Sequence, residues 1–265
     1  MLSFQGRIHK DNAAQWYSLV SDQLLNPGFR DDDFKRLKKE MIDGIKSGLK
    51  ASNDEELGKE VLYSALYKNH PYESYNYGDI SDLEALTLDD VKAFYNSELT
   101  QSKLTVGLIG AVPADLRAKM MSDFATLPKG EQSRLSIPDA PALKGHHATI
   151  VEKSAQSTAV SFGFPIDTIR SSEDWTALWL VRSYFGEHRS SNSFLYERIR
   201  ETRGMNYGDY AYIEYFPRGM FQTKPDANLG RSEQIFQVWL RPLRSNNDAH
   251  FATRTALFEL DKLIK

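Results

Sequence analysis

Apolar residues recur every three or four positions in the first part of the chain, a spacing that predicts helices. It indicates helices over 13–25 and 31–49. The apolar positions of the second helix are Phe34, Leu37, Met41, Ile42, Ile45 and Leu49. Residues 54–67 predict a third helix, and Thr87 and Asp90 form a capping-box pattern that begins a fourth.

The remaining stretches of this first part are shorter. Residues 69–83 show neither the apolar spacing of a helix nor the alternation of a strand. They are expected to form a polar, tyrosine-bearing loop. Residues 103–111 are an apolar run bounded by turn formers, which predicts a buried strand. Pro113 then suits the first turn of a helix that ends near Leu127.

The second part of the chain mixes strands and helices without regular alternation. The predicted order is strand, strand, helix, helix, strand, strand, helix, with the first six at 148–152, 157–166, 172–185, 193–201, 206–216 and 235–240. This order favours an α+β fold, in which helices pack on one face of a mostly antiparallel sheet.

Residues 128–145 are rich in Pro, Gly, Ser and Lys and lack periodicity, so they are expected to form a linker. Two domains follow from this interpretation, one over 1–127 and one over 146–265. The chain ends inside an amphipathic helical pattern. We therefore expect the first domain to be incomplete at its N-terminus and the second at its C-terminus.

Composition removes several functional classes. The net charge is −3 and the pI is about 6.1, which argues against a nucleic-acid partner. The longest apolar runs are too short for insertion into a membrane. The chain has no cysteine, which excludes disulfides and thiolate metal sites, but leaves a bacterial periplasmic and a cytoplasmic location equally open.

Common catalytic motifs are missing as well. No two of the six histidines are three or four residues apart, the helical spacing that lets two imidazoles share a metal. The dipeptide Glu187-His188 lacks the preceding histidine of an H-x-x-E-H motif. There is no G-x-S-x-G elbow and no phosphate-binding glycine loop. The acidic run 31–33 is interpreted as a helix cap.

One segment, from Phe194 to Tyr212, predicts a helix that ends at a glycine and leads into a tyrosine-rich strand. It resembles the second-half signature of the pitrilysin/insulinase family of zinc metallopeptidases (peptidase family M16, which includes processing peptidases). In that signature a helix-borne arginine precedes a tyrosine by seven residues, and the matching positions are Arg200 and Tyr207. Further matches extend the resemblance over nearly the whole chain, at 24–27, 70–72, 86–95 and 110–112.

The resemblance implies a zinc cofactor that this chain is not expected to bind itself. The family's zinc site uses an H-x-x-E-H helix in the first half, which is missing here, and a glutamate from a later helix. The acids near that glutamate position are Glu40 and Asp43, whereas the aligned positions are Ile45 and Ser47. The chain is therefore either a trimmed peptidase or a zinc-free subunit, and a shifted alignment that makes Glu40 the ligand remains open.

The resemblance also implies roles for the two signature residues. Arg200 would hold a peptide carbonyl or carboxylate with its forked donors, and Tyr207 would donate to the oxyanion forming on the scissile carbonyl. The alternative is that Arg200 pairs with Glu197 or Glu201 and that Tyr207 only packs. The aromatic cluster that includes Tyr210 and Tyr212 fits a wall that binds extended peptide, but fits ordinary sheet packing equally well.

These inferences give two expected functions. The first is a part of a metalloendopeptidase that binds peptide or unfolded polypeptide, contributes Arg200 and Tyr207 to zinc held by a partner domain or subunit, and is not proteolytic alone. In this family the two halves close around the peptide like a clamshell. The second is a non-enzymatic scaffold that retains the peptidase fold for assembly.

Overall fold

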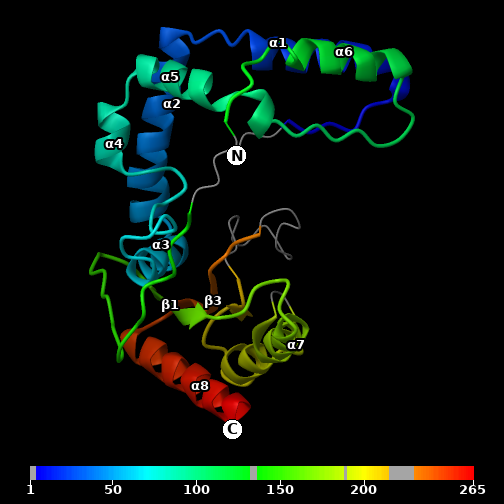
Figure 1. Ribbon diagram of the computed structural model, residues 1–265. Helices are drawn as coiled ribbons and strands as arrows, with labels where there is room; N and C mark the ends of the chain where they lie inside the picture. The colour runs from blue at the N-terminus through cyan, green and yellow to red at the C-terminus, as the bar shows by residue number, and fades with distance from the viewer. Residues whose placement is uncertain (1–3, 132–135, 188–189, 215–229) are drawn as a thin grey trace. The chain divides into compact units, whose positions relative to one another are not determined.

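The computed structural model describes residues 4–131, 136–187, 190–214 and 230–265 (Figure 1). The chain forms two compact units. Unit 1 contains Met1–Ile42 and Ile80–Leu135, and unit 2 contains Asp43–Asp79 and Ser136–Lys265. The second unit thus includes a segment that precedes the linker expected at 128–145, so the units are not two consecutive stretches of chain.

All regular elements among the described residues of unit 1 are helical. Its elements are η1 (Lys10–Asn12), α1 (Ala13–Leu25), α2 (Asp31–Asp43, whose last residue is counted with unit 2), α4 (Ile80–Ala85), α5 (Leu88–Glu98), η3 (Gln101–Lys103) and α6 (Ala114–Phe124). The predicted helices are confirmed, and α5 begins at the expected capping box of Thr87 and Asp90. Helix α4 begins inside the stretch that was expected to be a loop.

Helices α1 and α6 share a small core. Tyr17, Leu116 and Met120 are buried there, and the Tyr17 hydroxyl donates to Asp123 Oδ2 at 2.9 Å. Burial, together with this carboxylate, raises the pKa of Tyr17 to about 12. The Tyr17 ring and its hydrogen bond therefore fix α1 and α6 against each other.

The strand predicted at 103–111 is wrong. After η3 the backbone of these residues is irregular, and the side chains of Val106, Leu108 and Ile109 are exposed, with Ile109 fully so. A buried strand needs neighbours on its edges, and unit 1 has no strand among its described residues. The strand predicted at 148–152 in unit 2 is wrong too, and Ile150 is exposed there.

The described residues of unit 2 include a three-stranded antiparallel sheet. Its strands are β1 (Thr158–Ile166), β2 (Asp209–Tyr212) and β3 (Gln234–Leu243), in the order β1-β3-β2. Residues 237–240 of β3 pair on both sides, as Val238 does with Phe162 and with Ala211. The described chain therefore confirms a mixed helical and antiparallel fold.

Alternation along β3 separates the two faces of this sheet. Phe236, Val238 and Leu240 belong to the main core, with residues of α7 (Asp174–Gly186), η4 (Tyr196–Glu201) and α8 (Asn246–Ile264). The opposite face carries Ile235 and Trp239 and is covered by α3 (Asp54–Leu66). Helices therefore pack on both faces of this sheet, and the prediction that they pack on one face is wrong. Helix α3 follows η2 (Gly44–Ala51), a π-helix that continues α2. No described helix is long and apolar enough to cross a membrane.

Candidate functional site

Arg200 lies in a widened helical turn rather than in a regular α-helix. Element η4 is a π-helix, in which the backbone N–H of Thr202 donates to the Glu197 carbonyl at 2.9 Å, five residues back. Gly204 then ends the turn with φ +59°, a left-handed conformation that favours glycine. Its N–H donates to the Arg200 carbonyl at 2.7 Å, so the turn that leads to Tyr207 is fixed at Arg200 itself.

The structure brings the two predicted signature residues together. The guanidinium carbon of Arg200 lies 5.2 Å from the centroid of the Tyr207 ring, and Tyr207 is 71% exposed. Arg200 Nη1 also donates to Glu201 Oε1 at 2.5 Å and contacts the Tyr196 hydroxyl. The pair is thus accessible, and the ion pair with Glu201 that the sequence offered as an alternative is present beside it.

A third residue, Arg241 on β3, approaches the same ring. Its guanidinium carbon lies 5.5 Å from the Tyr207 centroid, and its Nε is 3.2 Å from Glu55 Oε2. Burial works against the charge of Arg241, but Glu55 and the Tyr210 hydroxyl hold its pKa above the usual value. Sequence reasoning missed Arg241, since only the pairing of β2 with β3 brings it beside this turn.

The turn before β2 is tied to β3 by one amide. Asn206 Nδ2 donates to Asp209 Oδ1 at 2.6 Å and to the Arg241 carbonyl at 3.2 Å. Strand pairing continues from there, with Asp209 opposite Leu240. Tyr207 is therefore presented by a turn whose position relative to Arg241 is set by both side-chain and backbone contacts.

Tyr210 and Tyr212 lie behind the site rather than on its surface. They are 4% and 1% exposed, and the Tyr212 ring packs on Trp239 with centroids 4.2 Å apart. This is the ordinary sheet packing that the sequence also allowed, and it leaves neither ring open to a peptide. Tyr215 and Phe216, two further members of the expected aromatic wall, lie outside the described residues, as does His188.

Arg241 is linked to buried charged residues of α3. Glu55 is buried and its Oε1 accepts from Lys59 Nζ at 3.2 Å, while Glu56 Oε1 accepts from the same ammonium at 2.6 Å. Glu55 therefore binds two cations, the buried Lys59 and the partly exposed Arg241. This anchoring fixes Arg241 more firmly than an exposed surface arginine would be fixed.

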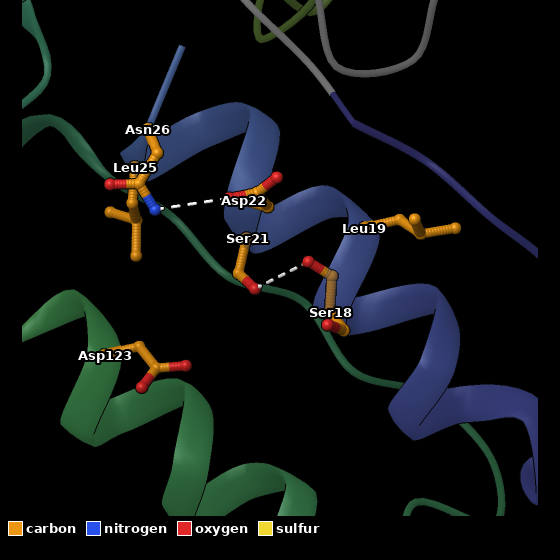
Figure 2. A pocket seen from close by; sticks show the side chains of 7 residues that line it. All are labelled: Ser18, Leu19, Ser21, Asp22, Leu25, Asn26 and Asp123. Carbon is orange, nitrogen blue, oxygen red and sulfur yellow. Dashed lines mark hydrogen bonds between the residues drawn. The ribbon is translucent and has the colours of Figure 1, made fainter. Parts of the chain in front are cut away.

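A shallow pocket in unit 1 contains two further acids. Figure 2 shows it between α1 and α6, lined by Ser18, Leu19, Ser21, Asp22, Leu25, Asn26 and Asp123. Asp22 already accepts from Asn26 Nδ2 at 3.3 Å, and Asp123 accepts from Tyr17 and from Lys119 Nζ at 2.9 Å. Because both carboxylates are engaged, we assign no chemistry to this pocket.

Comparison with known proteins identifies the family. The model of the peptidase M16 inactive domain matches residues 85–249, which is more than half of the chain. The chain belongs to the M16 inactive-domain family. The resemblance inferred from Arg200, Tyr207 and the accompanying motifs is thereby confirmed.

Relatives of this M16 chain differ in the activity that their names state. It is 25% identical to an uncharacterized zinc protease of Mycobacterium leprae, over 83% of this chain and 49% of that protein. It is 24% identical to a non-peptidase homologue of Helicobacter pylori, over 77% of this chain and 48% of that protein. The chain therefore spans about half the length of these curated relatives.

A solved structure shows the same fold. The peptidase M16 inactive domain from Pseudomonas fluorescens superposes with a TM-score of 0.70 at 24% identity, over 88% of this chain and 52% of that chain. At this identity the match concerns the fold and not the chemistry. It agrees with the mixed architecture described above.

Relatives of this M16 chain are named as zinc proteases, but the donors among its described residues do not fit zinc. Within the described ranges, no three His, Asp or Glu side chains come together as a metal site. Glu40, the one candidate ligand left open by the sequence, accepts from Arg36 Nη1 at 3.0 Å on an exposed helix face. We therefore derive no chemical step through a metal held by these residues.

Proposed function

We propose that this M16 chain is a peptide-binding part of a metallopeptidase assembly, with zinc held by a partner domain or subunit. The observation that carries the proposal is the contact between the Arg200 guanidinium and the exposed ring of Tyr207. The substrate would be a peptide or an unfolded polypeptide. The chain alone would not be proteolytic.

The chemistry of the pair supports this role. A guanidinium offers rigid, forked donors to a carbonyl or carboxylate, and a phenol can donate to an oxyanion as charge develops. The cation–π contact holds the Tyr207 ring while its exposed edge remains open to a ligand. Tyr210 and Tyr212, which were expected to bind substrate, would act in this proposal by supporting Arg241 and Trp239 from behind.

The relatives support an assembly of this kind. They include a protein named as a zinc protease and one named as a non-peptidase, and this chain covers about half of either. A zinc-bearing partner, covalently joined or separate, would supply the metal that the described donors do not fit. The Arg200–Tyr207 pair would then act on a peptide held between the two.

The test is the double variant Arg200→Ala with Tyr207→Phe in the complete assembly. We expect peptide turnover to fall by about 100-fold or more, as when an oxyanion donor is removed, with little change in thermal stability. The matched control is Arg244→Ala with Tyr77→Phe, because Arg244 and Tyr77 are both largely exposed and neither belongs to the site. Equal turnover in the two double variants would refute the proposal.

A scaffold function is the second candidate, and one observation favours it. Arg200 is already bound inside the chain, to Glu201 and Tyr196. A scaffold predicts that the Arg200/Tyr207 variant alters only folding or assembly, which size-exclusion chromatography measures. Peptide cleavage by the purified chain that stops on addition of a chelator would contradict both candidates.

A further inference from the structure

Arg241 gives the exposed Tyr207 ring a second cation. Arg200 approaches the ring from η4, at 5.2 Å, and Arg241 approaches it from β3, at 5.5 Å. The side chains of Arg200 and Arg241 are 29% and 26% exposed, so both remain accessible from solvent. Two guanidinium groups thus flank one open aromatic surface, and the sequence signature accounts for only one of them.

The acids around this ring are each bound to a cation. Glu55 is the carboxylate bound to Arg241, and it shares the buried ammonium of Lys59 with Glu56. Glu201 is the carboxylate bound to Arg200, and it lies at the surface. Three cations and three carboxylates thus balance, and the surface carboxylate of Glu201 is the one that a ligand carboxylate can replace.

We propose that Arg241 is a specificity-determining residue, and that Arg200, Tyr207 and Arg241 together select peptides that present a carboxylate. In the free chain the side chain of Glu201 occupies the place that a ligand carboxylate would take at Arg200. The inference rests on the proposed peptide-binding function and adds the class of peptide that is bound. The carboxylate belongs either to an Asp or Glu side chain or to a free C-terminus.

The geometry favours a carboxylate over a neutral group. Guanidinium and carboxylate are planar and complementary, and their paired hydrogen bonds are among the strongest in proteins. Arg241 is held by Glu55 through Nε, so its orientation is fixed before a ligand arrives. Contact with the Tyr207 ring restrains the guanidinium of Arg200 similarly. A neutral peptide would use the tyrosine surface but would form no ion pair with either guanidinium.

Binding of three labelled peptides to the full chain at low salt tests the inference. The peptides share one sequence and differ at two points: a central Glu with an amidated end, a central Gln with an amidated end, and a central Gln with a free C-terminus. We expect a carboxylate-bearing peptide to bind about 10-fold more tightly than the neutral one. Comparing the first and the third peptide, each against the neutral second one, separates a side-chain carboxylate from a terminal one.

Two variants locate the effect. Arg241→Met should reduce the preference for the carboxylate peptide to less than about 3-fold, whereas Arg244→Met, on an exposed arginine paired with Asp248, should leave it unchanged. Glu201→Gln removes the internal competitor and should tighten carboxylate binding several-fold. Because Glu201 is a surface residue, this second variant remains informative if Arg241→Met fails to fold.

The outcomes distinguish this inference from the function on which it rests. Equal binding of all three peptides overturns the selectivity and leaves the peptide-binding function intact. Failure of every peptide to bind overturns both. If Arg241→Met weakens all peptides by the same factor, Arg241 serves only to anchor Glu55 and the inference is wrong. If Glu201→Gln has no effect on the carboxylate peptide, no ligand carboxylate replaces Glu201 at Arg200, and the inference is wrong as well.

Discussion

Lys59 holds its ammonium nitrogen 3.8 Å from the centroid of the Trp239 ring, beneath the sheet of unit 2. The side chain is only 2% exposed and is bound to Glu55 and Glu56. A cation this deeply buried is stable only because an aromatic face and two carboxylates replace its water. Helix α3 is thereby fixed over the strand that carries Arg241.

Replacing this lysine should therefore destabilise the chain strongly. Lys59→Met would leave Glu55 and Glu56 without their shared cation, at a cost of about 3 kcal/mol in the free energy of unfolding. Lys35→Met is the control, because Lys35 pairs with Asp31 on an exposed helix face and its loss should not be measurable. Urea unfolding of both variants measures the difference. Similar midpoints would show that the buried network contributes little.

The stability of unit 2 should fall as the pH rises through the acid range. Burial raises the pKa of Asp209 from 3.8 to about 7, although its bonds to Asn206 and Arg241 oppose the shift. Between these values the folded state keeps a proton that the unfolded state loses, so the contribution of Asp209 to stability is largest below about pH 4 and declines up to about pH 7.

Asp209→Asn tests this pH dependence, because the amide resembles the protonated acid. At pH 8 we expect the variant to be more stable than the parent chain by about 2 to 4 kcal/mol, and at pH 4 by little. Urea unfolding at the two pH values gives the comparison. A variant effect that is the same at both would mean that Asp209 does not titrate as described.

The centre of the sheet should not tolerate a methyl group at Gly163. A Cβ there would lie 2.4 Å from the carbonyl oxygen of Phe236 on the paired strand. Gly163→Ala should therefore cost about 1 to 3 kcal/mol by forcing β1 and β3 apart. Gly107→Ala is the control, since a Cβ at Gly107 meets no atom within 4 Å. Equal thermal stability of the two variants would refute the close approach.

Local signals in the sequence predicted the helices well. The span of α1 follows from the spacing of its apolar residues, and the start of α5 follows from the side chains of Thr87 and Asp90. Neither signal depends on the rest of the fold. The pairing of Arg200 with Tyr207 was likewise predictable, because a single turn connects them. The family resemblance extended this local pattern to a function.

Features that depend on distant partners were not predictable. The apolar run 103–111 has the composition of a strand, but a strand exists only where another edge receives its hydrogen bonds. Arg241 reaches Tyr207 only through the register that places Tyr210 opposite Trp239. The residues next to 103–111 do not show whether a partner strand exists, and the residues next to Arg241 do not show how β2 and β3 pair.

The π-helical turn at η4 bears on how this site withstands a deletion. A π-turn contains one residue more than an α-turn, so removing a single codon between Tyr196 and Ile199 would restore the ordinary winding. The wider turn spreads its additional residue over nearly the same rotation, so Arg200 would keep its direction relative to the buried Leu195 at the start of the helix. Its guanidinium would still face Tyr207. A one-residue deletion in this turn would thus shorten the helix without separating the pair.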